Sequence, residues 1–248
     1  AAFYGHLDCL QFAYEQGCPW NYAVYKDAAR NGHLHILQYA HSQGLAWHTA
    51  VCAMAAREGK LSCLQFAHEN GCPWDSHTTT SAAHTGHVHC LMYALEHGCH
   101  VEVGACKMAC MCGHLNCLQL LHQFGAPWDE SVPVHAAMCP TIDCLQYLHE
   151  NGCPWDKYTP NQAVGKGRIA PLRYALEHGC PYYDEIVRWT VQGNYLDCLR
   201  YLVEDQLLVL SRDVFIVALL RGDLECLQYL LDQGCPCADA KIANTAEQ

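Results

Sequence analysis

The stretch Gly5–Trp20, with the sequence GHLDCLQFAYEQGCPW, decides the fold of this chain. It returns as GKLSCLQFAHENGCPW at Gly59–Trp74 and as GHLNCLQLLHQFGAPW at Gly113–Trp128. The leading residues of the repeat recur at one constant step, with a single insertion before the last: Gly5, Gly32, Gly59, Gly86, Gly113, Pro140, Gly167, Asn194 and Gly222. A period of roughly 20–50 residues is typical of a stacked array of repeated units.

One unit predicts two helices. In Leu61–Asn70 the apolar residues recur at i, i+3 and i+4, which indicates an amphipathic helix of about ten residues. Gly71 is expected as its left-handed C-terminal cap, and Pro73 prevents continuation. Asp75 is expected to cap the next helix, which carries the alanine pair Ala82-Ala83. We call the helix with the alanine pair the first helix and the helix after the leading glycine the second helix.

The order of these features resembles the ankyrin repeat. The matching features are the paired alanines, the glycine-histidine turn, the second-helix leucine and the terminal glycine. The 27-residue unit is shorter than an ankyrin repeat of about 33 residues, and the β-hairpin is missing. The resemblance implies an all-α fold, a right-handed α-solenoid of stacked ankyrin-like helix-turn-helix repeats, and a role as an interaction scaffold.

We expect residues 1–248 to form a single array of about nine units. Ala1-Ala2 occupies the alanine-pair position, and Gln248 precedes the next expected leading residue by one position. Both ends therefore cut a repeat, which predicts that the sequence is an excerpt of a longer chain.

Composition narrows the class of partner. The net charge is −11 with only 14 lysines and arginines, which argues against nucleic acid, because affinity for it depends on cation–phosphate contacts. The sequence contains no run of about 18 apolar residues, so we do not expect membrane insertion. The 19 cysteines are odd in number and too widely spaced along the array for disulfides. We therefore expect a reducing, intracellular and most simply cytoplasmic location.

Cysteine and histidine recur at equivalent positions of successive repeats, and we call each such set of positions a column. Most second helices carry a cysteine expected on the core side, as at Cys9 and Cys63, and another cysteine follows the capping glycine, as at Cys18 and Cys72. A weak candidate for a metal site is the cluster Cys106, Cys110, Cys112, His114 and Cys117, because four thiolate or imidazole ligands suit zinc. Three of these five occupy ordinary repeat positions, so we expect no metal and no cofactor. A metal- or redox-responsive module remains the alternative.

No arrangement of a nucleophile with its base stands out, so we do not expect an enzyme. The tryptophans after each capping turn (Trp20, Trp47, Trp74, Trp128 and Trp155) are interpreted as packing over the seam between repeats, with an aromatic stripe for a partner as the alternative. In the last third, Gln206 replaces the capping glycine. The apolar residues Leu207–Leu210 that follow either bury in a reshaped seam or form a contact surface.

The position after each alanine pair varies from repeat to repeat. In ankyrin-like stacks it lies on the concave side of the first helix. The candidate partner-binding residues at this position are Arg30, Arg57, His84, Met111, Met138 and Gln192. We expect a scaffold or adaptor that binds another protein of unknown identity through this surface. Neutral surface variation is an equal alternative for the column, and an architectural subunit of a larger complex is an alternative for the whole chain.

Overall fold

The computed structural model describes residues 1–205 and 208–237. The predictions for Gln206 and Leu207 and for the array end at Gln248 lie outside these residues. Within the described part, the chain contains seventeen α-helices and one short 3-10 helix, and no strand. The expectation of an all-α fold is confirmed at this level. The chain divides into two compact units, Ala1–Val132 and Pro133–Gln248, each of which is described by itself.

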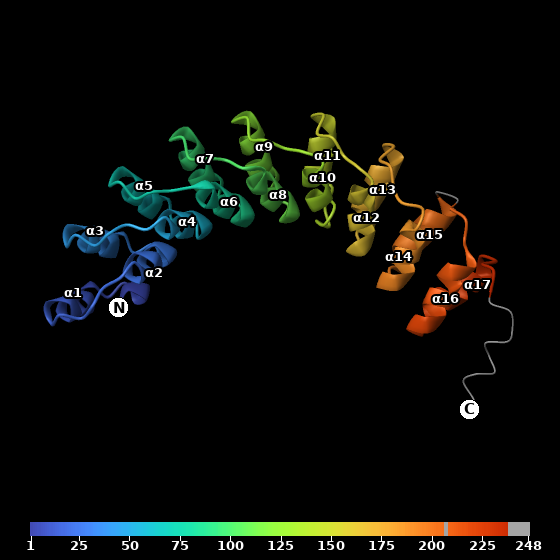
Figure 1. Cartoon of the computed structure of the whole chain (residues 1–248), viewed down its shortest axis with the longest axis horizontal. Coiled ribbons are helices and arrows are strands. Elements are labelled where there is room, and N and C mark those ends of the chain that lie inside the picture. The colour runs from blue at the N-terminus through green and yellow to red at the C-terminus, as the bar shows by residue number, and fades with distance from the viewer. Residues whose placement is uncertain (206–207, 238–248) are drawn as a thin grey trace, which may run out of the picture. The chain divides into compact units, whose positions relative to one another are not determined.

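In the unit of residues 1–132, first and second helices alternate along the chain (Figure 1). A 3-10 turn, Ala2–Tyr4, precedes them. The first helices are α2 (Ala23–Asn31), α4 (Ala50–Arg57), α6 (Ser76–Thr85) and α8 (Val103–Met111). The second helices are α1 (Leu7–Glu15), α3 (Leu34–Ser42), α5 (Leu61–Glu69), α7 (Val88–Glu96) and α9 (Leu115–Gln123). Neighbouring first helices pack against one another from α2 to α8, and neighbouring second helices do so from α3 to α9.

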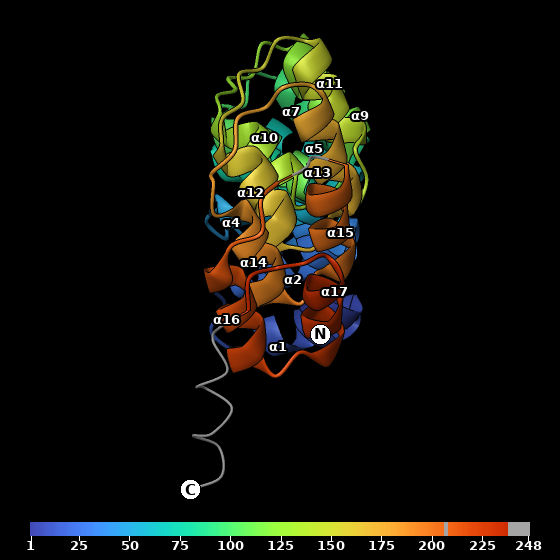
Figure 2. The same cartoon turned by 90° about the vertical axis from the view of Figure 1, so that its right-hand side faces the viewer.

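The unit that begins at residue 133 has the same alternation. Its first helices are α12 (Tyr158–Gly165), α14 (Ile186–Gly193) and α16 (Arg212–Arg221). Its second helices are α11 (Asp143–Glu150), α13 (Ile169–Glu177), α15 (Leu196–Glu204) and α17 (Leu224–Asp232). Figure 2 shows α12, α14 and α16 in one row and α13, α15 and α17 in the other, and α12 packs against α14, α14 against α16 and α13 against α15. The short α10 (Ser131–Ala136) spans the division between the units.

Local sequence accounts for the helix ends. The predicted helix after Gly59 is α5, and Gly71 beyond it has a φ of 82°, a conformation that a residue with a Cβ adopts only with strain. The Asp75 carboxylate accepts a hydrogen bond of 3.0 Å from the His77 backbone N–H, which caps α6 as expected. Asp129 and Asp156 accept the equivalent bonds from Ser131 and Tyr158. The sequence therefore sets where these helices start and stop.

The core lies between the two rows of helices in each unit. The alanine pairs Ala28-Ala29, Ala55-Ala56 and Ala82-Ala83 are fully buried, as are the second-helix leucines Leu37 and Leu64. Small side chains at the pairs allow the first helices to approach closely. The described helices have at most ten residues. None of them is long and apolar enough to cross a membrane, which requires about 20 residues.

The cysteine columns are buried with two exceptions in the first repeat. Cys63 and Cys72 are buried as expected, but their equivalents Cys9 and Cys18 are exposed. The prediction that Cys9 lies on the core side is therefore wrong. This position packs against the preceding repeat, as Cys226 does against Asn194, and no second helix precedes α1 in the described unit.

Candidate protein-interaction surface

The structure places four of the predicted partner-binding residues in the unit of residues 1–132. Arg30, Arg57, His84 and Met111 lie in the last turns of α2, α4, α6 and α8, which pack against one another in that order. Arg30 and Arg57 are exposed, and His84 and Met111 are half-buried. Consecutive helices thus present one residue each from the same position, and the residues differ in charge and polarity.

The alanine pair that precedes each of these residues is buried, so the helix backbone beneath the surface is fixed. The pairs before Arg30, Arg57 and His84 have no exposed area, nor do Ala109 and Cys110 before Met111. A surface held by a packed interior loses little conformational entropy on binding, which favours recognition by a preformed shape.

The two arginines differ electrostatically. The Nε of Arg30 lies 3.7 Å from Oε1 of Glu58, and both side chains are substantially exposed, so the pair is screened by solvent. Arg57 is exposed and forms no ion pair with any residue that the structure describes. Its guanidinium is therefore the more available positive charge for an acidic group of a partner.

The half-buried members of the group have neighbours of their own. The Nδ1 atom of His84 lies 3.7 Å from the Cys112 thiol sulfur, which joins α6 to the end of α8. Met111 is a flexible, polarisable side chain beside them. The surface therefore changes from basic side chains on α2 and α4 to less charged, more polarisable side chains on α6 and α8.

The other two predicted residues lie in the second unit. Gln192 is exposed near the end of α14. Met138 follows the short α10 and is half-buried, and its carbonyl oxygen accepts a hydrogen bond of 3.1 Å from Nε of Arg168. The six predicted residues are thus grouped as four in one unit and two in the other.

The position after the alanine pair takes part in a backbone contact between repeats that the sequence did not reveal. The Nε2 of His33 donates to the Phe3 carbonyl oxygen at 3.1 Å, and the Tyr195 hydroxyl donates to the Gly165 carbonyl oxygen at 3.4 Å. Phe3 and Gly165 occupy the same repeat position as Met138. In these repeats the residue after the leading position therefore reaches back one repeat and bonds to the backbone of the variable position. The recurring glycine-histidine dipeptide is the only feature of the sequence that points to this contact between repeats.

These contacts explain the leading glycines. A Cβ built on Gly59 would lie 2.7 Å from the ring of His87, and one on Gly86 would lie 2.7 Å from the ring of His114. Tyr195 takes the same place over Gly167. The ring of one repeat thus occupies the space that a side chain on the preceding leading residue would need.

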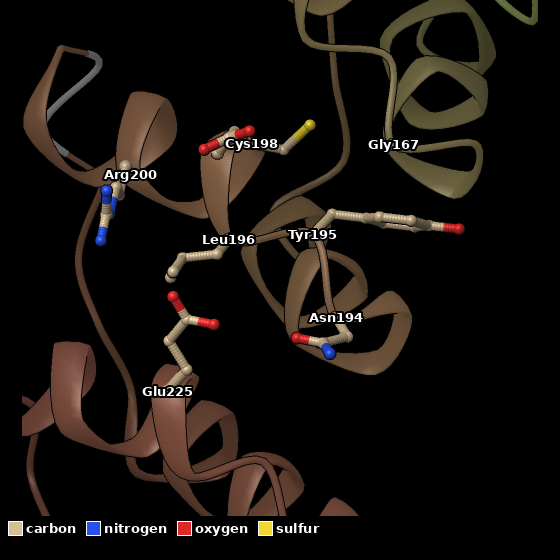
Figure 3. Close-up of a pocket in the computed structure, with 8 residues that line it drawn as sticks. Gly167, Asn194, Tyr195, Leu196, Cys198, Arg200 and Glu225 are labelled. Atoms are coloured by element: carbon tan, nitrogen blue, oxygen red, sulfur yellow. The ribbon is translucent and has the colours of Figure 1, made fainter.

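A small hollow recurs next to this contact. In the second unit it measures about 370 Å³ and lies at the start of α15, where Tyr195 extends toward the Gly167 turn and Arg200 and Glu225 approach from α15 and α17 (Figure 3). The hollow of about 220 Å³ in the first unit is lined by Gly86 and Gly113–Cys117, most of which are the equivalent positions three repeats earlier. The hollow is therefore a feature of the repeat.

The structure does not bring the five residues of the weak metal candidate together as a set of ligands. Cys106, Cys110 and Cys117 are buried, and Cys112 and His114 are half-buried. Burial raises the pKa of the Cys106 thiol to about 11. Across residues 1–205 and 208–237, no three side chains of His, Cys, Asp or Glu are placed to hold a metal ion.

The tryptophans pack against the second helices. Trp74 stacks on His68 with the ring centroids 3.8 Å apart, and Trp155 stacks on His149 at 4.2 Å. Each tryptophan also meets the edge of a tyrosine in the next repeat, Tyr93 or Tyr174. The tryptophans thus lie over the seams between repeats, which agrees with the structural interpretation of this column.

No protein-family model matches the chain, and no curated protein matches it.

Proposed function

We propose that this chain is an array of ankyrin-like repeats, a right-handed α-solenoid, that acts as a scaffold or adaptor and binds another protein through its first-helix surface. The observation that carries this proposal is the contrast within consecutive first helices. The alanine pairs are fully buried, whereas the next residue is exposed or half-buried and differs in chemistry at Arg30, Arg57, His84 and Met111. Positions that build the fold repeat, and positions that face a partner vary.

The electrostatics suggest how such a partner would be oriented. The chain carries a net charge of −11, so an acidic patch on a partner is repelled by most of the surface. Arg57, exposed and without an ion pair among the described residues, is a local exception. We infer that it directs an acidic group toward α4 and that Met111 supplies an apolar contact further along the row. The proposal includes no catalytic activity.

The first experiment is capture of the partner from a lysate of the source organism, followed by measurement of its affinity for two variants. Arg57→Gln removes one positive charge from the first-helix surface. Gln38→Glu lowers the net charge by the same amount at an exposed position of the second helix α3. We expect Arg57→Gln to weaken binding about 10- to 150-fold, as for a charged hydrogen bond, and Gln38→Glu to change it less than 2-fold, with equal melting temperatures.

Equal effects of the two variants would contradict a site on the first helices, because only overall charge would then matter. A second comparison uses the variant with Arg57, His84 and Met111 all changed to alanine. If it captures the same proteins as the wild type, the first-helix surface of this unit is not the binding surface.

A further inference from the structure

A hollow of about 680 Å³ lies on the second-helix side of the first two repeats, away from the proposed first-helix surface. It is situated between the turn after α1 and the turn after α3. Tyr14, Glu15 and Trp20 line one side, and Gln43–Leu45 line the other. The hollow therefore combines aromatic rings with a carboxylate.

Three aromatic rings meet at this place. The rings of Tyr14 and Trp20 lie 4.5 Å apart, and Tyr39 is edge-on to both, at 6.5 Å from Tyr14 and 5.8 Å from Trp20. Tyr14 remains 36% exposed, so the group is open to solvent. Burial, followed by Glu15 and Tyr14, raises the pKa of the Tyr39 hydroxyl.

In the second unit, arginine side chains lie against Tyr201 and Tyr229, which occupy the same repeat position as Tyr39. The Arg200 guanidinium lies 5.7 Å from the centroid of the Tyr229 ring, and the Tyr229 hydroxyl donates a hydrogen bond of 2.9 Å to Glu204. One repeat earlier, the Arg173 guanidinium lies 4.9 Å from the centroid of Tyr201. A cation over an aromatic face is attracted by the negative potential of the ring.

The repeat register makes the comparison direct. Tyr39 is equivalent to Tyr201 and Tyr229, and Glu15 is equivalent to Glu204. The position of Arg173 and Arg200 is Gln11 in the first repeat. Arg200 and Glu204 lie four residues apart on one face of α15, as Gln11 and Glu15 do on α1. The first repeat therefore has the ring and the carboxylate but lacks the arginine.

Two further tyrosines of this column are covered in a second way. His97 packs on Tyr93 and His178 packs on Tyr174, each with ring centroids 4.1 Å apart. The position of these histidines in the second repeat is Gln43, which lines the hollow. Tyr39 thus has glutamine at both positions from which an arginine or a histidine covers four other tyrosines of this column.

We propose that the Tyr39 ring, together with Glu15 and the adjoining hollow lined by Tyr14 and Trp20, binds an arginine side chain of a partner protein. The guanidinium would occupy the place that Arg200 takes over Tyr229, with Glu15 in the role of Glu204. The next repeat lacks this chemistry, because it has Ser42 at the position of Glu15 and Phe66 at the position of Tyr39. The proposal does not depend on the first-helix surface, since α1 and α3 carry this site and α2 and α4 carry Arg30 and Arg57.

The test uses the full chain and a tri-arginine peptide, with a tricitrulline peptide of the same shape and no charge as its control. Binding is followed by the NMR resonance of the Trp20 indole N–H, assigned with Trp20→Phe. We expect tri-arginine to shift this resonance and tricitrulline to leave it unchanged. Gln11→Arg fills the site from within, so we expect at least 10-fold weaker binding, and Glu15→Gln should weaken binding about 5-fold.

The matched control is Gln38→Arg, which adds the same charge one repeat later, at an exposed position of α3. It should change tri-arginine affinity less than 2-fold, and Arg57→Gln should not weaken it. Equal weakening by Gln11→Arg and Gln38→Arg would show that the acidic surface attracts the peptide without a site. Absence of a Trp20 shift at millimolar tri-arginine would also overturn the proposal. If Gln11→Arg lowers the melting temperature, Glu15→Gln alone decides the outcome.

Discussion

Two clusters of four rings, one in each unit, allow a comparison within a single chain. In the first unit the cluster is His68, Trp74, Tyr93 and His97, and in the second it is His149, Trp155, Tyr174 and His178. The histidine-to-tryptophan planes meet at 13° and 12°, and the two histidine rings are 5.4 and 5.2 Å apart. The Nδ1 atoms of His68 and His149 both lie 3.0 Å from a tyrosine hydroxyl.

The agreement between the two clusters indicates that the residues of two neighbouring repeats are sufficient to determine these contacts. The clusters are separated by three repeats along the chain and belong to different compact units. The same four residues at the same spacings nevertheless produce the same geometry. The clusters differ in their surroundings, because Tyr93 is buried and Tyr174 is half-buried. Matched substitutions can therefore separate the contribution of the cluster from that of its surroundings.

Removal of the tryptophans is expected to have the largest effect on the free energy of unfolding. Trp74→Ala and Trp155→Ala each remove a half-buried ring that stacks on a histidine and touches a tyrosine. We expect each to lower the free energy of unfolding by about 2–4 kcal/mol, at or below the range for fully buried aromatic residues. Urea denaturation followed by circular dichroism measures both. A loss in one variant more than twice that in the other would break the equivalence of the clusters.

A smaller effect is expected from the tyrosine hydroxyls. Tyr93→Phe and Tyr174→Phe leave the rings in place and remove the hydrogen bond to His68 or His149. The loss should be about 1 kcal/mol in each case, and slightly larger for the buried Tyr93. The double variants with His68→Gln and His149→Gln complete two thermodynamic cycles. Additive effects in either cycle would show that the hydrogen bond contributes nothing to stability.

The smallest effect concerns pH and sharpens the comparison at His68. Burial, followed by the neighbouring His97, lowers the pKa of His68 below its ordinary value of 6.5, and Glu69 opposes this only in part. Between the lowered pKa and about 6.5, the unfolded chain therefore binds more protons than the folded chain. Stability should fall as the pH decreases through this window. His68→Gln should reduce the slope of unfolding free energy against pH, and His97→Gln should reduce it less.

The pH experiment compares urea midpoints at pH 7.5 and pH 5.5. Glu69→Gln provides a control of opposite sign, because Glu69 raises the pKa of His68 and its removal should steepen the slope. Identical slopes in the wild type and His68→Gln would contradict the assignment of this titration to His68.

The sequence was sufficient for local structure. The bounds of α5, the left-handed cap at Gly71 and the carboxylate cap at Asp75 follow from residues within a few positions of each other. The exposure of Cys9 could not be predicted in this way, because Cys9 and Cys63 occupy the same repeat position and differ only in their neighbours.

The candidate sites show the same limit. Arg30 and Arg57 are exposed after their buried alanine pairs, whereas His84 and Met111 at the same repeat position are half-buried, a difference that the repeat pattern does not predict. The hollow beside Tyr39 was not predicted, because it depends on residues that meet across the seam between repeats. Gln11 and Tyr39 belong to different repeats, and the significance of Gln11 is apparent only where Arg200 is seen over Tyr229.

The rings that pack over Gly5, Gly59, Gly86 and Gly167 have a consequence for how such chains change during evolution. Gly59 and His87 share one space, as do Gly86 and His114, although each pair is divided between two repeats. Duplication or deletion of one whole repeat preserves these pairs when all repeats carry the same partners. Recombination between unlike repeats separates them, for example where Tyr195 instead of histidine covers Gly167. A junction between a leading glycine and the residue after it divides two such pairs, whereas a junction elsewhere in the repeat divides one, so exchange is least disruptive when its ends lie away from the glycine turn.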